Sequence, residues 1–260
     1  MDTLTVSTLS FREEANRALQ QWHVDRDNAD TAYVLLFDST PWRRFHEEAT
    51  HLLSPMEQER ALRFRYSQHR DTYVLAHAFW RLALSALLTL ETHDVPLIST
   101  ATGQPQLPKT AYATSLSHSG NHVAIAIGSA TALGVDIEQS PPRQGLHSLV
   151  SVLCAPTEAA ALQSLAPDDR DLALLALWTR KEALLKAFGV GLRESPSTIA
   201  ADMGRIIEPP PSVASAPACC VQQLSLPHGL VGALAAPPSI VHVALHWLMP
   251  PSHSNDRVAP

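Results

Sequence analysis

The sequence has few charged residues and no excess of basic ones. Only 17% of its 260 residues are charged, and 25 Asp and Glu outnumber 19 Lys and Arg, which gives a formal net charge of -6. Without clustered basic side chains a protein cannot neutralise the phosphates of a nucleic acid, so we expect no nucleic-acid partner. The chain is 45% hydrophobic, which is enough for a sizeable core and argues against wholesale disorder.

Cysteine and long apolar runs are also scarce. The three cysteines, Cys154, Cys219 and Cys220, form an odd number, and the adjacent pair is unsuited to bridge itself, so no disulfide framework is expected. The first residues, MDTLTVSTLSFREEAN, have neither the basic nor the apolar region of a signal peptide. No apolar run approaches the roughly 20 residues that cross a bilayer. We therefore expect a cytoplasmic protein without a membrane partner.

Strand and helix patterns alternate along the chain. Alternating or β-branched runs predict strands at 31–37, 95–100, 112–117, 122–127, 132–138, 229–236 and 240–247, and helical periodicity predicts helices after Ser54 and over about 70–90, 146–153, 157–164 and 168–188. The order of strand, helices and strands occurs twice, which predicts an α+β fold of two similar α/β lobes. We expect an N-terminal arm at 1–29, an N-terminal lobe at 30–133, a C-terminal lobe at 134–249 and a disordered tail at 250–260.

The first candidate site is the segment GVDIE at 134–138. Alternate residues of a strand share a face, so Asp136 and Glu138 would point one way while Val135 and Ile137 face the core. Two adjacent carboxylates repel each other unless a cation or a proton lies between them, which makes the pair a candidate site for a hard metal ion. A solvent-facing strand that carries two acids would show the same pattern.

The second candidate lies in the helical segment that begins at Trp178. Glu182 and Lys186 are four residues apart and are therefore neighbours on one face of the helix. An ordinary surface ion pair has the same spacing. Lys181 and Lys186 would also suit a metal-bound phosphate, because the lysines neutralise phosphate oxygens while the carboxylate between them holds the cation.

The third candidate is the segment SLSHSG at 115–120, where a predicted strand ends. A serine beside a histidine suggests nucleophilic hydrolysis, but adjacent residues rarely reach attack geometry and the chain has no G-x-S-x-G motif. A phosphate-binding turn is the more economical interpretation, because serine hydroxyls, the His118 ring and backbone N–H groups can all donate hydrogen bonds. The chain has neither a Walker A nor a G-x-G-x-x-G motif, which gives no support to nucleoside-triphosphate or dinucleotide folds.

Four segments, taken in order, resemble the motifs of the 4′-phosphopantetheinyl transferases of the Sfp (surfactin-type) class. They are GQPQLP at 103–108, SLSHS at 115–119, GVDIE at 134–138 and the segment 178–192. The resemblance covers about residues 31–250 and implies the pseudo-two-fold α/β fold of that family. It also implies an enzyme that transfers the 4′-phosphopantetheine group of coenzyme A to a serine of an apo acyl or peptidyl carrier protein and releases 3′,5′-ADP.

The resemblance assigns roles to individual residues. Mg²⁺ would be the cofactor, held against the pyrophosphate of coenzyme A by Asp136, Glu138 and Glu182. The catalytic residues would be Asp136, Glu182, Lys186 and His118, with Glu182 also accepting the serine proton. The contacts with coenzyme A, the co-substrate, would come from Arg60, Arg70, Gly103, Gln104, Pro105, Ser117, His118, Lys181 and Lys186.

One position departs from the family pattern. The family usually has a lysine after the glycine of its first motif, and this chain has Gln104 there. Either the adenylate end of coenzyme A is bound more weakly here, or another cation such as Lys109 takes the place of that lysine. The length and two-lobed pattern suit the broad-specificity class, which favours secondary metabolism. Because both lobes lie in one chain, we expect a monomer.

Two other functions stay open from the sequence. The chain could be a non-catalytic module that binds coenzyme A or a carrier protein, although such a module has no need of the three acidic residues. It could also be a Mg²⁺-dependent phosphoesterase, in which water rather than a carrier serine attacks the phosphorus.

Overall fold

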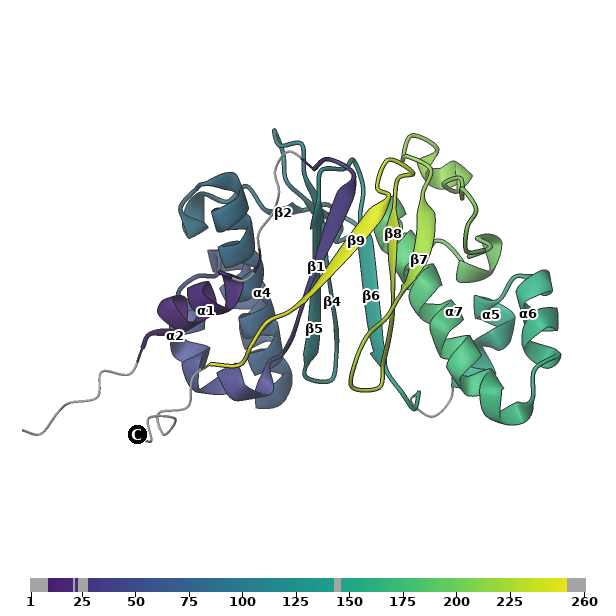
Figure 1. The fold of residues 1–260 in the computed structure, drawn as a ribbon, viewed down its shortest axis with the longest axis horizontal. Coiled ribbons are helices and arrows are strands. Elements are labelled where there is room, and N and C mark those ends of the chain that lie inside the picture. The colour runs from purple at the N-terminus through teal and green to yellow at the C-terminus, as the bar shows by residue number, and fades with distance from the viewer. Residues whose placement is uncertain (1–8, 21, 23–27, 143–145, 252–260) are drawn as a thin grey trace, which may run out of the picture. The chain divides into compact units, whose positions relative to one another are not determined.

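The computed structural model describes residues 9–20, 22, 28–142 and 146–251 (Figure 1). About half of the predicted arm at 1–29 and most of the predicted tail at 250–260 lie outside the described residues. The helices are α1 (Phe11–Leu19), α2 (His46–Thr50), α3 (Pro55–Leu62), α4 (Ser67–Leu88), α5 (Val150–Leu153), α6 (Pro156–Gln163) and α7 (Pro167–Phe188). The strands are β1 (Thr31–Asp38), β2 (Ile98–Ser99), β3 (Pro105–Gln106), β4 (Ala113–Ser119), β5 (His122–Gly128), β6 (Gly134–Gln139), β7 (Cys220–Leu224), β8 (Leu230–Ala236) and β9 (His242–Trp247).

The chain divides into two compact units, which we describe separately. The first comprises Met1–Val24, Phe37–Val95 and Trp247–Pro260, and the second comprises Asp25–Leu36 and Pro96–His246. The mixed α+β fold predicted from the sequence is confirmed, while the lobe boundaries at 30–133 and 134–249 stay a prediction. Among the described residues, no helix is both long enough and apolar enough to span a membrane.

The first unit is built around a cluster of aromatic rings. Phe11 of α1 meets the rings of Trp42 and Phe79 edge-on, at centroid distances of 6.0 and 5.4 Å. Ser10 begins α1 with a capping box, in which its hydroxyl accepts from the Glu13 N–H and its own N–H donates to the Glu13 carboxylate. Helix α1, which lies within the residues predicted as an N-terminal arm, is therefore docked through a buried ring.

A second capping box orients α3 in the same unit. Ser54 caps the helix, and the Glu57 carboxylate accepts from the Ser54 N–H at 2.7 Å. Glu57 also accepts from Nε of the buried Arg81 in α4, at 2.6 Å. The same carboxylate therefore begins α3 and ties it to α4.

The second unit contains two main sheets and the long helix α7. One sheet has the strand order β4-β5-β1-β9, and the other has the order β6-β8-β7 with β8 antiparallel to both neighbours. Figure 1 shows α7 along one face of the β6-β8-β7 sheet, with α5 and α6 on the far side of the helix. Leu184 and Phe188 of α7 pack there into a core with Val221 of β7 and Ala233 of β8.

Two features of this unit differ from the predicted elements. Strand β7 was not expected, because its short sequence CVQQL has no clear alternation and follows a proline-rich stretch, and it is a strand through its pairing with β8. The strand predicted at 95–100 is reduced to the two residues of β2, which pair with the two residues of β3.

The packing of α7 on β6 explains the glycine that opens the acidic motif. A Cβ on Gly134 would lie 1.9 Å from the carbonyl oxygen of Ala183 and 2.6 Å from the backbone nitrogen of Ala187. No side chain can occupy that space, because the obstructing atoms belong to the helix backbone. Gly134 thus allows α7 to approach the first residue of β6 directly.

Candidate functional site

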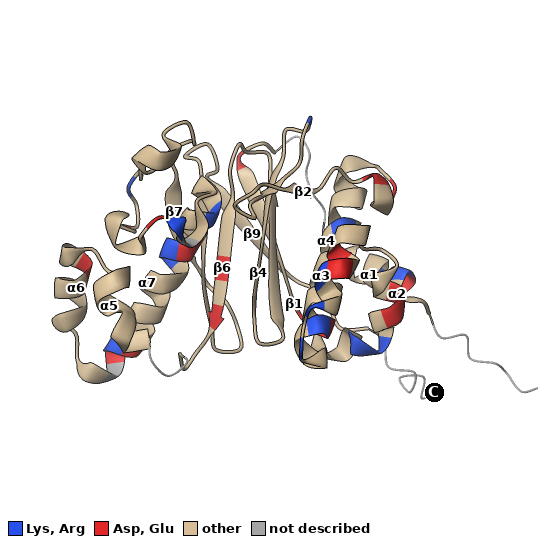
Figure 2. Ribbon diagram, turned by 180° about the vertical axis from the view of Figure 1, so that it is seen from behind, with Lys and Arg blue, Asp and Glu red and all other residues tan. Residues whose placement is uncertain are grey.

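The two acids of the GVDIE segment lie on β6 with the alternation expected of a strand. Val135 and Ile137 are fully buried, while Asp136 is 5% exposed and Glu138 is partly exposed. Figure 2 shows the acidic positions along β6 and charges of both signs on α7. The backbone of β6 thus fixes two carboxylates on one face, as the sequence predicts.

Three serines of β4 hold the edge of β6. The hydroxyls of Ser115, Ser117 and Ser119 accept hydrogen bonds from the backbone N–H groups of residues 135, 137 and 139, at 3.1, 3.3 and 3.1 Å. Because β4 and β6 belong to different sheets, these side chains take the place of a backbone ladder. We call this set of three the serine ladder.

Two members of the serine ladder also reach the acids. The Ser117 hydroxyl donates to Oδ1 of Asp136 at 2.8 Å, and the Ser119 hydroxyl donates to Oε2 of Glu138 at 2.7 Å. Ser117 is buried, and its hydroxyl already donates one hydrogen bond and accepts another. The hydroxyl proton of Ser117 is thus committed to Asp136, and the predicted contact of Ser117 with coenzyme A stays untested.

Helix α7 brings Lys186 and Glu182 to the same acids. The ammonium of Lys186 donates to Oδ1 of Asp136 at 2.7 Å and to the carbonyl of Val135 at 3.0 Å. Glu182 lies one helical turn earlier, where the negative charges of Asp136 and Glu138 raise its pKa. The structure thus brings together the three acids and one lysine that the sequence selected from two distant segments.

Burial raises the pKa of Glu182 from its ordinary value of 4.5 to about 7. The negative charge of Asp136 raises this pKa as well, the positive charge of Lys186 lowers it, and Glu138 adds a smaller rise. A carboxyl group that keeps its proton near neutral pH is either short of a cation or suited to exchange a proton.

The donor set of this site fits a divalent cation. Oδ2 of Asp136 and Oε1 of Glu182 are buried, and neither accepts a hydrogen bond from any described residue. Buried acceptors without a partner are costly, and carboxylate oxygens are the ligands that Mg²⁺ prefers. The side chains do not form a ready-made metal site, because no group of three or more His, Cys, Asp or Glu residues is arranged to hold a metal within the described parts of the chain.

The raised pKa of Glu182 predicts a pH dependence of stability in the metal-free protein. Between pH 4.5 and 7 the unfolded chain has released this proton while the folded chain retains it, so the free energy of unfolding falls as the pH rises. Glu182→Gln removes this titrating group. The free energy of unfolding of the variant, relative to that of wild type, should therefore rise by on the order of 2 kcal/mol from pH 5 to pH 8. Urea unfolding at the two pH values, with a chelator present, measures this difference. An equal pH dependence in both proteins would contradict the assignment.

The structure places His118 on the opposite face of β4 from Ser117. Successive residues of a strand point to opposite faces, and His118 is exposed whereas Ser117 and Ser119 are buried against β6. The prediction that His118 contacts a phosphate stays untested.

Lys181 is not available to a ligand, which corrects the prediction that it contacts coenzyme A. Its side chain is 0% exposed and forms an ion pair with Glu158 of α6 at 2.7 Å. The same ammonium donates to the carbonyls of Pro196 and Ile199, at 2.8 and 2.6 Å. All three N–H donors are thus committed inside the protein, so the charge ties α6 and the segment after α7 to the helix.

The two arginines expected to contact coenzyme A, Arg60 and Arg70, belong to the first compact unit. Arg60 of α3 is exposed, and its guanidinium lies 5.8 Å from the centroid of the Tyr73 ring. Arg70 of α4 is half-buried, and its Nε has no hydrogen-bond partner among the described residues. Their contact with a phosphate stays a prediction.

Comparison with known proteins identifies the family. The model described as "4'-phosphopantetheinyl transferase, N-terminal" matches residues 39–130, and the model described as "4'-phosphopantetheinyl transferase superfamily" matches residues 132–227. The second match contains the serine-bound acids of β6, Lys186 and Glu182. The chain belongs to the 4′-phosphopantetheinyl transferase superfamily.

Several curated relatives carry the name of this transferase. The chain is 31% identical to the 4'-phosphopantetheinyl transferase HetI of Nostoc sp. over 144 aligned residues. These residues cover 54% of this chain and 61% of HetI. It is 26% identical over 141 residues to the 4'-phosphopantetheinyl transferase of Bacillus subtilis, covering 54% of this chain and 62% of that protein. With AcpT of Escherichia coli O157:H7 it shares 33% identity over 110 residues, covering 42% and 56%. The chain thus spans about three fifths of the length of the relatives it matches.

Gln104, which departs from the family's usual lysine, has a structural role here. Its amide nitrogen donates to the carbonyls of Lys186 and Ala187 at the C-terminal end of α7, at 3.3 and 3.1 Å. Gly103 allows the turn before it with a φ of 85°. The turn before Pro105 is therefore anchored to the helix that carries Glu182. The amide nitrogen of Gln104 donates to that helix. The predicted contacts of Gly103, Gln104 and Pro105 with coenzyme A stay untested.

Gln104→Ala should lower the free energy of unfolding by about 1–2 kcal/mol, because two helix-end carbonyls lose their donor. Gln104→Lys should recover most of that loss, since a cation at a helix C-terminus is favourable. Urea unfolding of the three proteins measures the effect. If Gln104→Ala keeps full stability and only weakens the binding of coenzyme A, the side chain contacts the ligand and not the helix.

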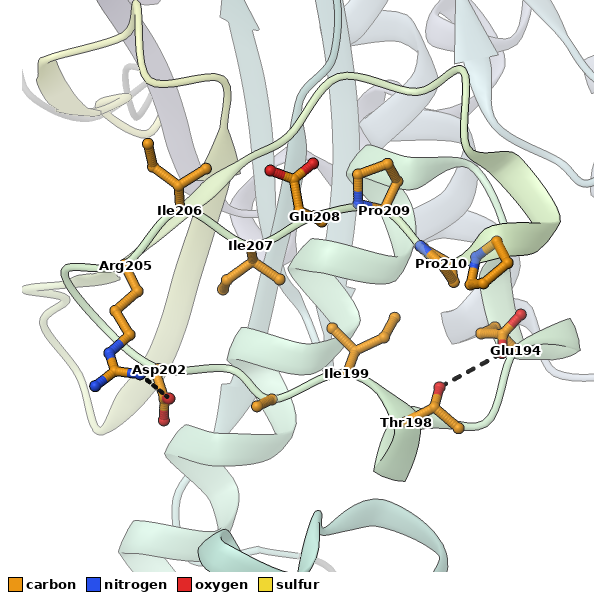
Figure 3. A pocket seen from close by; sticks show the side chains of 12 residues that line it. Glu194, Thr198, Ile199, Asp202, Arg205, Ile206, Ile207, Glu208, Pro209 and Pro210 are labelled. Atoms are coloured by element: carbon orange, nitrogen blue, oxygen red, sulfur yellow. Dashed lines mark hydrogen bonds and ion pairs between the residues drawn. The ribbon is translucent and has the colours of Figure 1, made fainter.

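A separate pocket of about 530 Å³ lies beside the segment that follows α7 (Figure 3). Its wall includes Ile199, Ile207 and Pro209–Pro211, and its rim carries an ion pair of 3.8 Å between Arg205 and Asp202. It contains none of the residues selected from the sequence.

The structural roles of Lys181, Gln104 and the serine ladder are not apparent from local sequence patterns alone. The ladder had a sequence signal, since Ser115, Ser117 and Ser119 alternate along a predicted strand and so share a face. The pairing of Lys181 with Glu158 had none, because the two residues lie on different helices.

Proposed function

We propose that this protein transfers the 4′-phosphopantetheine group of coenzyme A to a serine of an apo acyl or peptidyl carrier protein, with Mg²⁺ as cofactor. The proposal is supported by the superfamily match together with one feature of the site. That feature is the convergence of Asp136, Glu138, Glu182 and Lys186, in which two buried carboxylate oxygens accept no hydrogen bond from the part of the chain that the structure describes.

The chain's own residues have distinct tasks in this reaction. Asp136, Glu138 and Glu182 would hold Mg²⁺, which supplies positive charge to the phosphoryl oxygens and neutralises charge that builds up on them. Lys186 lies against Asp136 with its ammonium partly exposed, so it can also contact a phosphoryl oxygen. These contributions are electrostatic and require no covalent intermediate on the protein.

The chemical step exchanges one bond to phosphorus for another. The carrier serine oxygen attacks the β-phosphorus of coenzyme A, the bond from that phosphorus to the leaving phosphate oxygen breaks, and 3′,5′-ADP departs. The serine proton passes to Glu182, directly or through a water molecule.

The remaining parts of the proposal concern substrate binding and context. Arg60, Arg70 and His118 would bind phosphates of coenzyme A, and Gly103 and Pro105 would also contact coenzyme A. We place the chain in the surfactin-type class of secondary metabolism, as a cytoplasmic monomer with lobes at 30–133 and 134–249. Lys181 and Ser117 are left out of the coenzyme A contacts because their donors are committed within the fold.

Incubation with coenzyme A, Mg²⁺ and an apo carrier domain tests the proposed activity. The carrier should gain the mass of one phosphopantetheine group, measured by intact-protein mass spectrometry, and should gain none when a chelator replaces Mg²⁺. Consumption of coenzyme A without any acceptor would indicate a phosphoesterase. Binding of coenzyme A without transfer to any of several carriers would indicate a non-catalytic module.

A further inference from the structure

The serine ladder holds more than the backbone of β6. If its only task were to join β4 to β6, one hydrogen bond from each serine to a backbone N–H would complete it, and Ser115 makes only that bond among those resolved here. Ser117 and Ser119 make a second bond, to the carboxylates of Asp136 and Glu138. The repeat of two residues in both strands puts each hydroxyl beside one N–H and one acid.

The second bond determines which oxygen of Asp136 is left over. Oδ1 accepts from the Ser117 hydroxyl at 2.8 Å and from the Lys186 ammonium at 2.7 Å. Oδ2 accepts from no described residue and is buried. Two donors on the same oxygen fix the rotation of the carboxylate, so the unbonded oxygen has one defined position.

We infer that Ser117 and Ser119 are positioning residues for the cation-binding carboxylates, with Ser117 the more important of the two. Ser117 turns Asp136 so that Oδ2 is presented to a divalent cation, and Ser119 restrains Glu138 in the same way. This inference rests on the proposed function, because it names residues that act through the proposed metal ligands without touching the metal.

Three properties of the site favour this role. A hydrogen bond from a hydroxyl to an ionised carboxylate is short and strong, so it restrains the acid more firmly than packing would. Ser117 is buried, so water cannot replace its hydroxyl without reorganising the strand edge. Partners that orient metal ligands commonly change metal affinity by about 10–100-fold when they are removed.

A matched pair of variants isolates the carboxylate bond. Ser115→Ala and Ser117→Ala each remove one hydroxyl that accepts from a β6 backbone N–H, but only the second removes a donor to an acid. Mn²⁺ serves as the probe, because free Mn²⁺ is counted directly by electron paramagnetic resonance. The full chain is titrated with Mn²⁺ at saturating coenzyme A, and a sample with coenzyme A alone is subtracted.

We expect Ser117→Ala to bind Mn²⁺ about tenfold more weakly than wild type, Ser119→Ala to show a smaller loss, and Ser115→Ala to bind like wild type. Ser117→Thr, which keeps the hydroxyl, should restore most of the affinity. Urea unfolding of the same proteins should show a stability loss for Ser115→Ala and a larger one for Ser117→Ala, because both leave one backbone N–H without its acceptor and only the second also removes a donor from Asp136.

The outcomes separate this inference from the proposed function. Equal Mn²⁺ affinities in Ser115→Ala and Ser117→Ala would overturn the positioning role and leave the proposed transfer intact. A Ser117→Thr protein as weak as Ser117→Ala would overturn it too, since the hydroxyl would then not be what matters. If wild type binds no Mn²⁺ above the coenzyme A sample, both the positioning role and the proposed metal site fall.

Discussion

Asp136→Ala should reduce phosphopantetheine transfer by about a thousandfold or more. Asp136 is the acid to which Ser117 and Lys186 both donate, and its Oδ2 is a buried carboxylate oxygen that accepts from no described residue. A metal-bound phosphoryl group gains several kcal/mol of charge stabilisation in the transition state, and each tenfold in rate corresponds to about 1.4 kcal/mol. Initial rates of carrier modification under saturating coenzyme A and Mg²⁺ measure the loss.

The fold should survive this change. The Lys186 side chain is 29% exposed, so water can hydrate its ammonium when the carboxylate of Asp136 is removed. The ammonium also retains its hydrogen bond to the carbonyl of Val135. Asp136→Asn, which keeps the volume but not the charge, should be nearly as inactive. Glu91→Ala, at an acid whose side chain is 68% exposed, is the matched control and should transfer normally. Near-normal transfer by Asp136→Ala would contradict the assignment of Asp136 as a ligand of the proposed metal ion.

Lys181→Met should lower the free energy of unfolding by about 3–5 kcal/mol. The ammonium is fully buried and pairs with Glu158, whose other bonds come from the N–H groups of Ala155 and Ala201. Removing one partner of such a pair leaves the other charge buried without compensation, which is far more costly than losing an exposed pair. Urea unfolding followed by tryptophan fluorescence measures the change.

Two further proteins make the Lys181 result decisive. Arg63→Met removes a cation from an exposed pair with Glu59, whose side chains are 72% and 68% exposed, and should cost less than about 1 kcal/mol. The double variant Lys181→Met with Glu158→Gln should recover part of the stability, because the remaining buried charge is gone. A Lys181→Met protein of wild-type stability with a raised KM for coenzyme A would return Lys181 to the ligand contacts.

Local sequence patterns were sufficient for many individual elements. The period of two in GVDIE places Asp136 and Glu138 on one face, and the spacing of four joins Glu182 to Lys186, because both relations are set within one element. Capping chemistry was equally readable, since Ser54 and Pro55 begin α3 where expected. Strand β7 could not be read from the sequence, because the segment CVQQL forms a strand by pairing with β8.

The sequence by itself determined the α+β composition, the pairs of residues within each motif and, through their order, the resemblance to one family. Only the tertiary structure decided which of those side chains meet. In the tertiary structure Lys181 is buried in an ion pair with Glu158, and Gln104 donates to carbonyls at the C-terminal end of α7. Ser117 and Ser119 of the serine ladder donate to the acids of β6. The physical reason is that burial and hydrogen-bond partners are supplied by segments distant in sequence. Hence two lysines in one motif, Lys181 and Lys186, have different tasks: one holds the fold together, and the other lies in the candidate site.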